Sequence, residues 1–191
     1  MANSKQYSVE SQRVTIKDSV IKNLNYPFFD DLIVFYNIKA SVPYKIILEN
    51  ITFEGIKFER GGNLMKLSHQ QDDFLEINHC TFNNITNGGI HVVSFFSSLA
   101  ATLKTKVKMF NITTNRFEAQ DTRFVLLGEG AHVEIYNSTL KTISSLRIGG
   151  VIYAGSKQAV VKIYDSTFLN NTALEGGVFS SESESYIMCT R

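Results

Sequence analysis

Hydrophobic and polar residues alternate along this chain in a short pattern that recurs six times. Each copy begins with the apolar–x–apolar alternation of a β-strand, and five of the six return to an apolar residue at position eight. The copies are VTIKDSVIKNL (14–24), IILENITFEGI (46–56), LEINHCTFNNI (75–85), VKMFNITTNRF (107–117), VEIYNSTLKTI (133–143) and VKIYDSTFLNN (161–171). Successive copies start 32, 29, 32, 26 and 28 residues apart. A period of roughly 20–50 residues is typical of stacked structural repeats.

A second apolar run follows each copy. The runs are LIVFY (32–36), NLMKL (63–67), IHVV (90–93), FVLL (124–127), VIYA (151–154) and VFS (178–180). Four of them follow a Gly-Gly pair, and glycine permits the positive φ of a tight corner. Each repeat is therefore predicted to hold two or three short strands joined by turns. No extended helical periodicity accompanies them.

The spacing and the strand pattern predict an all-β fold, a right-handed parallel β-helix (solenoid) of about six coils. Each strand would pair with its copy one coil later, because a single coil cannot bury its own apolar face. The main rival, a β-propeller, needs about 40–45 residues per blade, which exceeds the period found here. The predicted division is an N-terminal extension or cap (1–13), β-helix repeats (14–185) and a C-terminal end (186–191). That end offers the last coil little cover, as expected of a truncated chain.

In such a stack, equal positions of successive copies become neighbours. Position two reads Glu76, Lys108, Glu134 and Lys162 in the last four copies, so opposite charges would alternate along a solvated face. Position five is mostly Asn or Asp, which favours turns, and His79 is interpreted as a hydrogen-bonding substitute there. Position seven is threonine in five copies, a β-branched column suited to a pleated surface. Ice binding by this column would require a flat, exposed face with two ranks of threonine, and one rank is visible.

Composition narrows the functional classes. The chain has 191 residues and a formal net charge of +1, so no nucleic-acid partner is expected. No apolar run reaches the roughly 18 residues of a membrane-spanning helix, and the N-terminus lacks an apolar signal core. The two cysteines form neither a disulfide framework nor a zinc motif, and no cofactor or metal is expected. The compartment stays open: extracellular or at the cell surface if the chain is a fragment of a larger protein, intracellular otherwise.

Two copies carry a family resemblance. FLNN (168–171) followed by GGVF (176–179) resembles the FxxN and GG-apolar signature of polymorphic outer membrane protein repeats, and FNN (82–84) followed by GGI (88–90) is a looser version. These repeats belong to the pectin-lyase-like right-handed β-helices. The resemblance covers roughly residues 14–185. It implies a non-catalytic role in adhesion, surface display or elongated spacing, with glycans or cell-surface proteins as partners. The same fold also hosts lyases and glycoside hydrolases of acidic polysaccharides, so fold alone does not decide.

An enzyme of that kind would need clustered carboxyl groups, about 6.5–9.5 Å apart in inverting glycosidases. The candidates are two adjacent pairs, Asp30-Asp31 and Asp72-Asp73. Both pairs fall outside the predicted strands, where aspartate is a common turn former. The catalytic hypothesis requires these carboxylates to gather on one face of the solenoid.

The strongest sign of binding is at position four. This position reads Phe110, Tyr136 and Tyr164 in the last three copies. Aromatic side chains on neighbouring coils would form an outward strip, either a platform for sugar rings or a partner protein, or simply a cross-strand stack.

Five N-glycosylation sequons complete the list of motifs. Their asparagines are Asn50, Asn84, Asn111, Asn137 and Asn170. In a secreted protein they would be surface acceptors. Three of the five lie at position five, where the repeat itself supplies Asn and a later Thr, so the sequons are either acceptors or by-products of the coil pattern.

Overall fold

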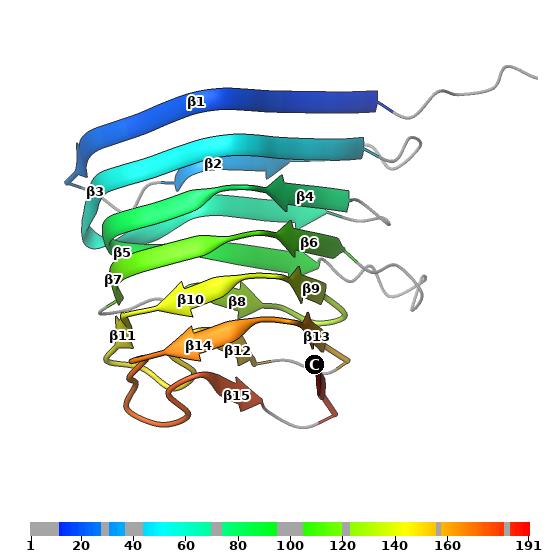
Figure 1. Ribbon diagram of the computed structural model, residues 1–191. Helices are drawn as coiled ribbons and strands as arrows, with labels where there is room; N and C mark the ends of the chain where they lie inside the picture. Colours follow the sequence, from blue (N-terminus) through cyan, green and yellow to red (C-terminus); the bar gives the residue numbers. More distant parts are fainter. Residues whose placement is uncertain are drawn as a thin grey trace, which may run out of the picture.

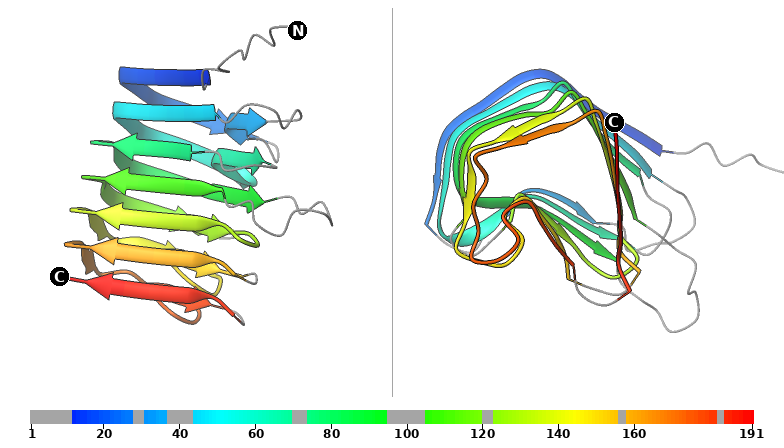
Figure 2. Two further views of the ribbon diagram at one scale, coloured as in Figure 1. Left: turned by 90° about the vertical axis from the view of Figure 1, so that its right-hand side faces the viewer. Right: turned by 60° about the horizontal axis from the view of Figure 1, so that its bottom comes forward.

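The computed structural model confirms the predicted all-β fold: the chain is a parallel β-solenoid of about five turns. It describes residues 12–27, 31–36, 44–69, 74–94, 105–119, 123–155, 158–181 and 184–191. Within these ranges there is no helix, and hence none that could cross a membrane. Strand β1 lies at one end of the stack and β16 at the other (Figures 1 and 2).

The described residues form sixteen strands, all paired in parallel. They are β1 (Gln12–Tyr26), β2 (Asp31–Tyr36), β3 (Tyr44–His69), β4 (Phe74–Asn78), β5 (Thr81–Ser94), β6 (Lys106–Phe110), β7 (Thr113–Ala119), β8 (Val125–Leu127), β9 (His132–Tyr136), β10 (Thr139–Lys141), β11 (Ile143–Ser145), β12 (Ile152–Ala154), β13 (Val160–Tyr164), β14 (Thr167–Leu169), β15 (Phe179–Ser181) and β16 (Tyr186–Thr190). The long strands β1, β3 and β5 bend around corners and so contribute to more than one side of the solenoid (Figure 2).

Three walls of stacked strands result. The first wall contains β4, β6, β9, β13 and β16 with the opening residues of β1 and β3. The second wall contains β10 and β14 with the middle of β1 and β3 and the start of β5 and β7. The third wall contains β2, β8, β12 and β15 with the ends of β3 and β5. Strand β11 pairs with the end of β7.

The register between turns is the one that the repeats predict. Position one of every copy faces position one of the next, from Val14 through Ile46, and so on to Val161. The first wall then continues by one further strand, because Val161 pairs with Ile187 of β16. The threonine column is also in register along the second wall. Stacking of equal positions is therefore the rule that places side chains throughout this molecule.

Each turn has two corners in the left-handed backbone region. Position five has φ between 45° and 54° in all six copies, as its Asn and Asp residues favour. Side-chain bonds join this column: Asn50 Nδ2 donates to Asp18 Oδ1 at 2.9 Å, and Asn111 Nδ2 lies 3.0 Å from His79 Nε2. The hydrogen-bonding role predicted for His79 is thus confirmed. Position ten forms the second corner, with φ between 53° and 61°; its residues are Asn23, Gly55, Asn84, Arg116, Thr142 and Asn170.

The Gly-Gly pairs serve two purposes rather than one. At Gly149 and Gly176 φ is 75° and 59°, the positive corner that was predicted. Gly88 has no positive φ; a Cβ there would lie 2.6 Å from Cε2 of Phe58, so this glycine allows close packing of the core.

The core residues are most completely buried in the middle turns. Positions one and three of the five copies from β3 to β13 are at most 3% exposed, whereas Val14 in β1 is 42% exposed. Phenylalanine rings fill the space between the walls: Phe53 stacks on Phe82 at 5.1 Å, and Phe82 meets Phe124 edge-on at 5.4 Å. A residue is buried here only when another turn covers it on both sides, as expected for a stack of repeats.

Candidate ligand-binding face on the first wall

The outward side of the first wall carries charged and aromatic side chains that contact one another. Positions one and three point into the core, so the alternation of a strand directs position two, position four and the residue before position one outward. We call this surface the charged–aromatic face. Its members are Lys45, Glu76, Lys106, Lys108, Phe110, His132, Glu134, Tyr136, Lys162 and Tyr164.

Glu134 is the centre of this face. Its Oε1 lies 3.1 Å from Lys106 Nζ and 3.2 Å from His132 Nε2. Its Oε2 lies 3.6 Å from Lys108 Nζ and accepts a hydrogen bond of 3.0 Å from the Tyr136 hydroxyl. We call these five residues the Glu134 cluster. The Glu134 side chain is only 7% exposed, although it sits at an outward position.

The protonation state of this cluster follows from its contacts. Burial alone would raise the pKa of the Glu134 carboxyl, but hydrogen bonds from Lys106 and Tyr136 and the charges of Lys106 and His132 outweigh it. The pKa therefore lies below the ordinary value of 4.5. Burial, the bond to the carboxylate and the charge of the carboxylate raise the pKa of Tyr136 to about 12. At neutral pH, Glu134 is ionised and Tyr136 keeps its proton.

The alternation of charges predicted at position two is confirmed, but its solvation is not. Glu76, Lys108, Glu134 and Lys162 are neighbours in register. The prediction of a solvated face is wrong at Glu134, because lysines of the preceding turn and two residues of its own strand surround its carboxylate. Lys162 differs from the other members, since it makes no ion pair with any residue that the structure describes.

Glu76 forms a smaller group one turn before Lys108. Its Oε2 lies 3.1 Å from Lys45 Nζ, and its Oε1 accepts a hydrogen bond of 2.8 Å from Asn78. Burial opposes ionisation, but these partners keep the pKa of Glu76 below its ordinary value. Both acidic residues of the column are thus neutralised by lysines from a neighbouring turn.

The three predicted aromatic residues form one stack. The ring centroids of Phe110 and Tyr136 are 4.7 Å apart and nearly parallel, and those of Tyr136 and Tyr164 are 4.6 Å apart. Both faces of the middle ring are therefore covered by protein, which leaves ring edges and hydroxyl groups for contact with a ligand. The cross-strand stacking interpretation is confirmed; a binding role for these residues stays a prediction.

The candidate catalytic carboxylates are tested only in part. Asp31 begins β2, where its Oδ1 accepts a hydrogen bond of 2.6 Å from Asn63 and its Oδ2 lies 3.4 Å from Lys66 Nζ. These contacts link two turns of the third wall. Asp30, Asp72 and Asp73 lie outside the described residues, so the clustering of all four stays a prediction. In the part of the chain that the structure describes, no group of three acidic, His or Cys side chains could hold a metal ion.

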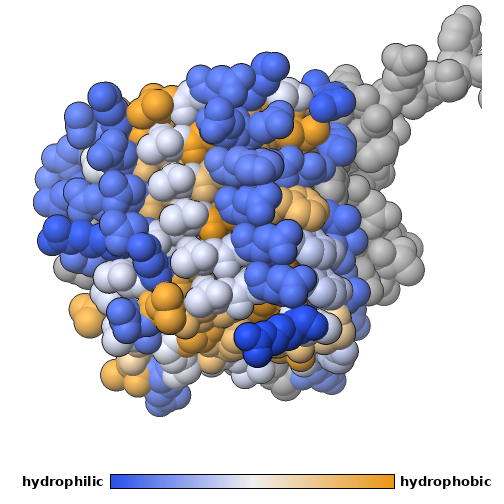
Figure 3. Space-filling view, in the orientation of Figure 1, coloured by the Kyte–Doolittle hydropathy of each residue, from blue (hydrophilic) through white to orange (hydrophobic). Residues whose placement is uncertain are grey.

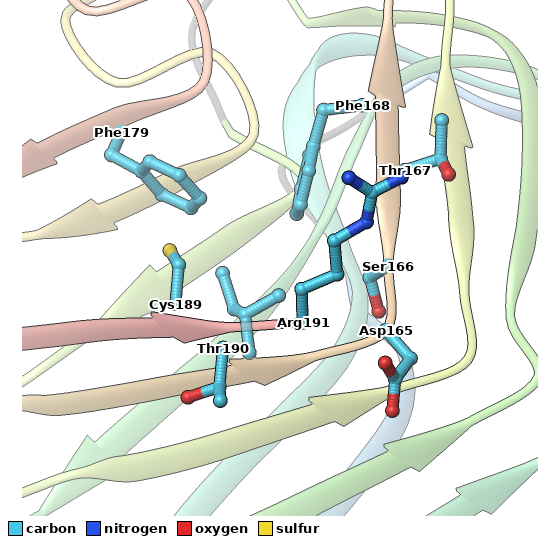
Figure 4. A pocket seen from close by; sticks show the side chains of 9 residues that line it. Asp165, Ser166, Thr167, Phe168, Phe179, Cys189, Thr190 and Arg191 are labelled. Atoms are coloured by element: carbon cyan, nitrogen blue, oxygen red, sulfur yellow. The ribbon is translucent and has the colours of Figure 1, made fainter.

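A cavity of about 640 Å³ opens at the end of the solenoid where β14, β15 and β16 lie. Figure 4 shows the rings of Phe168 and Phe179 facing this space, with the Arg191 side chain beside them. The two rings meet edge-on at 5.3 Å. The lining comes from β13 to β16, from the corner between β13 and β14, and from Arg191 after β16. None of the predicted site residues lies here.

Sequence reasoning missed two members of the Glu134 cluster. Lys106 and His132 precede position one of their copies, where the repeat pattern was taken to begin. The outward alternation extends one residue further than the apolar core positions, so a polar residue just before position one was the available signal. The burial of Glu134 had no local signal, because it depends in part on the lysine side chains of the preceding turn.

Comparisons with known proteins identify no family for this chain. No family model, no curated protein and no solved structure matches it. The fold and the geometry of the charged–aromatic face are therefore the basis for a functional proposal.

Proposed function

We propose that this chain is a non-catalytic β-solenoid module of a surface or secreted protein, which acts as a spacer and binds an extended acidic glycan on its charged–aromatic face. The observation that carries the proposal is the continuous stack of Phe110, Tyr136 and Tyr164 beside a column in which lysines alternate with glutamates. The resemblance of FLNN (168–171) and GGVF (176–179) to polymorphic outer membrane protein repeats supports a surface role.

The chemistry of the stack favours an anionic ligand. An aromatic ring is negative on its faces and positive at its edge. Because the stack covers ring faces and leaves edges outward, it attracts cations less and anions more than a single exposed ring would. Lys162 strengthens this preference, since its ammonium group forms no ion pair with any described residue and lies two positions from Tyr164.

The spacing of the face favours a polymer over a small molecule. Successive turns are about 4.8 Å apart, so the same groups recur at a regular interval along the solenoid axis. A linear glycan with one carboxylate per sugar presents a repeating charge to such a surface. The hydroxyl group of Tyr164, which has no partner in the described part of the chain, is available to the sugar hydroxyls.

Binding to a defined acidic glycan tests the proposal. We would measure the affinity of the chain for polygalacturonate and for neutral dextran by calorimetry, at low and at high salt. We expect binding to polygalacturonate alone, weakened by salt because the contacts are electrostatic. Equal binding of dextran, or no binding of either polymer, would contradict the proposal. Appearance of new reducing ends or unsaturated products during the assay would instead indicate the lyase or hydrolase alternative.

Two variants locate the site. Lys162→Ala and Tyr164→Ala should each weaken the binding of polygalacturonate several-fold. Lys57→Ala removes the same charge from an exposed position of β3 outside the charged–aromatic face and is the matched control. An equal loss of affinity in all three variants would mean that overall charge, and not this face, attracts the polymer.

A further inference from the structure

We propose that three of the five sequons, at Asn84, Asn137 and Asn170, are the N-glycosylation acceptors of this protein. Asn50 and Asn111 instead hold neighbouring turns of the solenoid together. The inference rests on the secretory route that the proposed function assumes. It follows from the contacts of the amide nitrogen, Nδ2, which is the atom that becomes glycosylated.

Exposure and backbone conformation do not separate the five residues. All five asparagines are exposed, and all have φ between 47° and 54°. Each therefore sits at an outward corner, where a glycan would point away from the core. The corner also explains why the repeat favours asparagine there, since this residue tolerates the left-handed region well.

The hydrogen bonds of Nδ2 do separate them. Asn50 Nδ2 donates to Asp18 Oδ1 at 2.9 Å, and Asn111 Nδ2 lies 3.0 Å from His79 Nε2. Each of these bonds ties one turn to the turn before it. No residue that the structure describes bonds to Nδ2 of the three proposed acceptors, so a glycan there displaces no contact of the fold.

The neighbouring residues in each column support the same assignment. Asn111 and Asn137 occupy position five of adjacent turns, about 4.8 Å apart, which is too close for two bulky glycans side by side. Asn137 is the residue of this pair with the unbonded amide. Asn84 follows Gly55 in the position-ten column, and glycine leaves the adjacent corner without a side chain.

Asn170 is the third acceptor and stands three turns beyond Asn84 in the same column, at a distance of about 14 Å. Asn84 and Asn170 lie at the corner between the second wall and the third, away from the charged–aromatic face. Asn137 follows Tyr136 directly and borders that face at its corner. None of the three acceptors belongs to the charged–aromatic face, so glycosylation and ligand binding are compatible.

The chemical step is an ordinary glycosyl transfer. The co-reactant is a lipid-linked oligosaccharide pyrophosphate. A bond forms between Asn Nδ2 and the anomeric carbon of the sugar, the bond from that carbon to the pyrophosphate oxygen breaks, and the lipid pyrophosphate leaves. Nδ2 gives up one proton. The hydroxyl group two residues later, from Thr86, Thr139 or Thr172, completes each acceptor motif.

The test is site mapping of the chain produced behind a secretion signal in a eukaryotic cell line. Cells and medium would be pooled, the protein deglycosylated enzymatically in ¹⁸O-water, and each former glycan site read as a labelled Asp by mass spectrometry. We expect high occupancy at Asn84, Asn137 and Asn170 and low occupancy at Asn50 and Asn111. Occupancy of Asn50 or Asn111 equal to that of the three, or an unmodified chain in the pooled sample, would overturn the inference.

Matched variants at the hydroxyl position confirm the assignment. Thr86→Val, Thr139→Val and Thr172→Val should each remove one glycan while keeping a β-branched side chain. The corresponding Thr→Ser variants should keep all three. The glycan-binding assay described above would be run on unglycosylated chain made in bacteria, so failure of that assay and failure of this mapping are independent results.

Discussion

The first and second walls have the same register and the same spacing, yet the threonine column of the second wall makes no side-chain bond between the described turns, unlike the charged and aromatic columns of the first wall. On the first wall, ion pairs and stacked rings join neighbouring turns. On the second wall, the outward column is threonine in five successive turns; these residues are Thr52, Thr81, Thr113, Thr139 and Thr167. In the part of the chain that the structure describes, none of their hydroxyl groups has a hydrogen-bond partner.

The spacing of the turns explains the difference. Stacked side chains are about 4.8 Å apart, beyond the roughly 3.5 Å limit of a hydrogen bond between short hydroxyl groups. Aromatic rings stack favourably at this separation, and long charged side chains can bend to meet. A pale column of near-neutral hydropathy runs along the solenoid between more hydrophilic columns (Figure 3). Register brings equal residues together, and side-chain reach decides whether they bond.

The largest effect should come from the Glu134 cluster. Glu134→Gln leaves Lys106, Lys108 and His132 close together without their counter-charge, and we expect the free energy of unfolding to fall by about 2–3 kcal/mol. Urea unfolding measures this. The matched control is Glu118→Gln, whose ion pair with Arg116 is more than half exposed and should contribute no more than about 0.5 kcal/mol. Equal losses in the two variants would remove the basis for treating the cluster as a link between turns.

The pH dependence of stability should report the same cluster. The pKa of Glu134 is lower in the folded chain than its ordinary value of 4.5, so the unfolded chain binds a proton first as pH falls. The stabilisation is complete above that ordinary value and is lost as pH falls through the folded pKa. Between about pH 7 and about pH 4, the wild type should therefore lose more stability than Glu134→Gln. A residual slope from Glu76 is expected in both; parallel curves would contradict the assignment.

The Tyr136 hydroxyl should contribute less than the carboxylate. Tyr136→Phe keeps the ring stack but removes the hydrogen bond to Glu134, and the expected loss is about 1 kcal/mol. Tyr164→Phe removes a hydroxyl that has no partner among the described residues and should change stability little. A loss in Tyr164→Phe as large as that in Tyr136→Phe would show that the bond to Glu134 is not the cause.

The sequence predicted what depends on local pattern. The walls, the register and the corner column with His79 all follow from residue types that recur at fixed positions. The second corner escaped notice because four different residue types occupy position ten, and Arg116 or Thr142 gives no turn signal. Strand β16 escaped for a similar reason: Ile187 repeats the position-one residue 26 positions after Val161, but position five is Arg191, which gives no turn signal.

The candidate site was predictable in outline and not in detail. The aromatic column could be read directly because each of its members occupies the same position. The Glu134 cluster could not, because Lys106 and His132 lie outside the repeat unit and because the burial of this outward side chain depends on two turns together. In a solenoid, the repeat alone predicts which residues stack in one column. A cluster of side chains can be predicted only when the neighbouring turns are considered as well.

The smallest effect should come from the second wall. Thr81→Val keeps the β-branched shape in the outward column and removes a hydroxyl without a partner among the described residues, so stability should change by no more than about 0.5 kcal/mol in either direction. Thr114→Val is the matched contrast: this buried threonine faces the core, donates to the carbonyl oxygen of Lys141 and accepts a bond from its amide. Its replacement should cost about 1–3 kcal/mol by leaving those groups unbonded. If Thr81→Val proved as costly as Thr114→Val in urea unfolding, the threonine column would bond the turns after all, and the contrast between the two walls would fail.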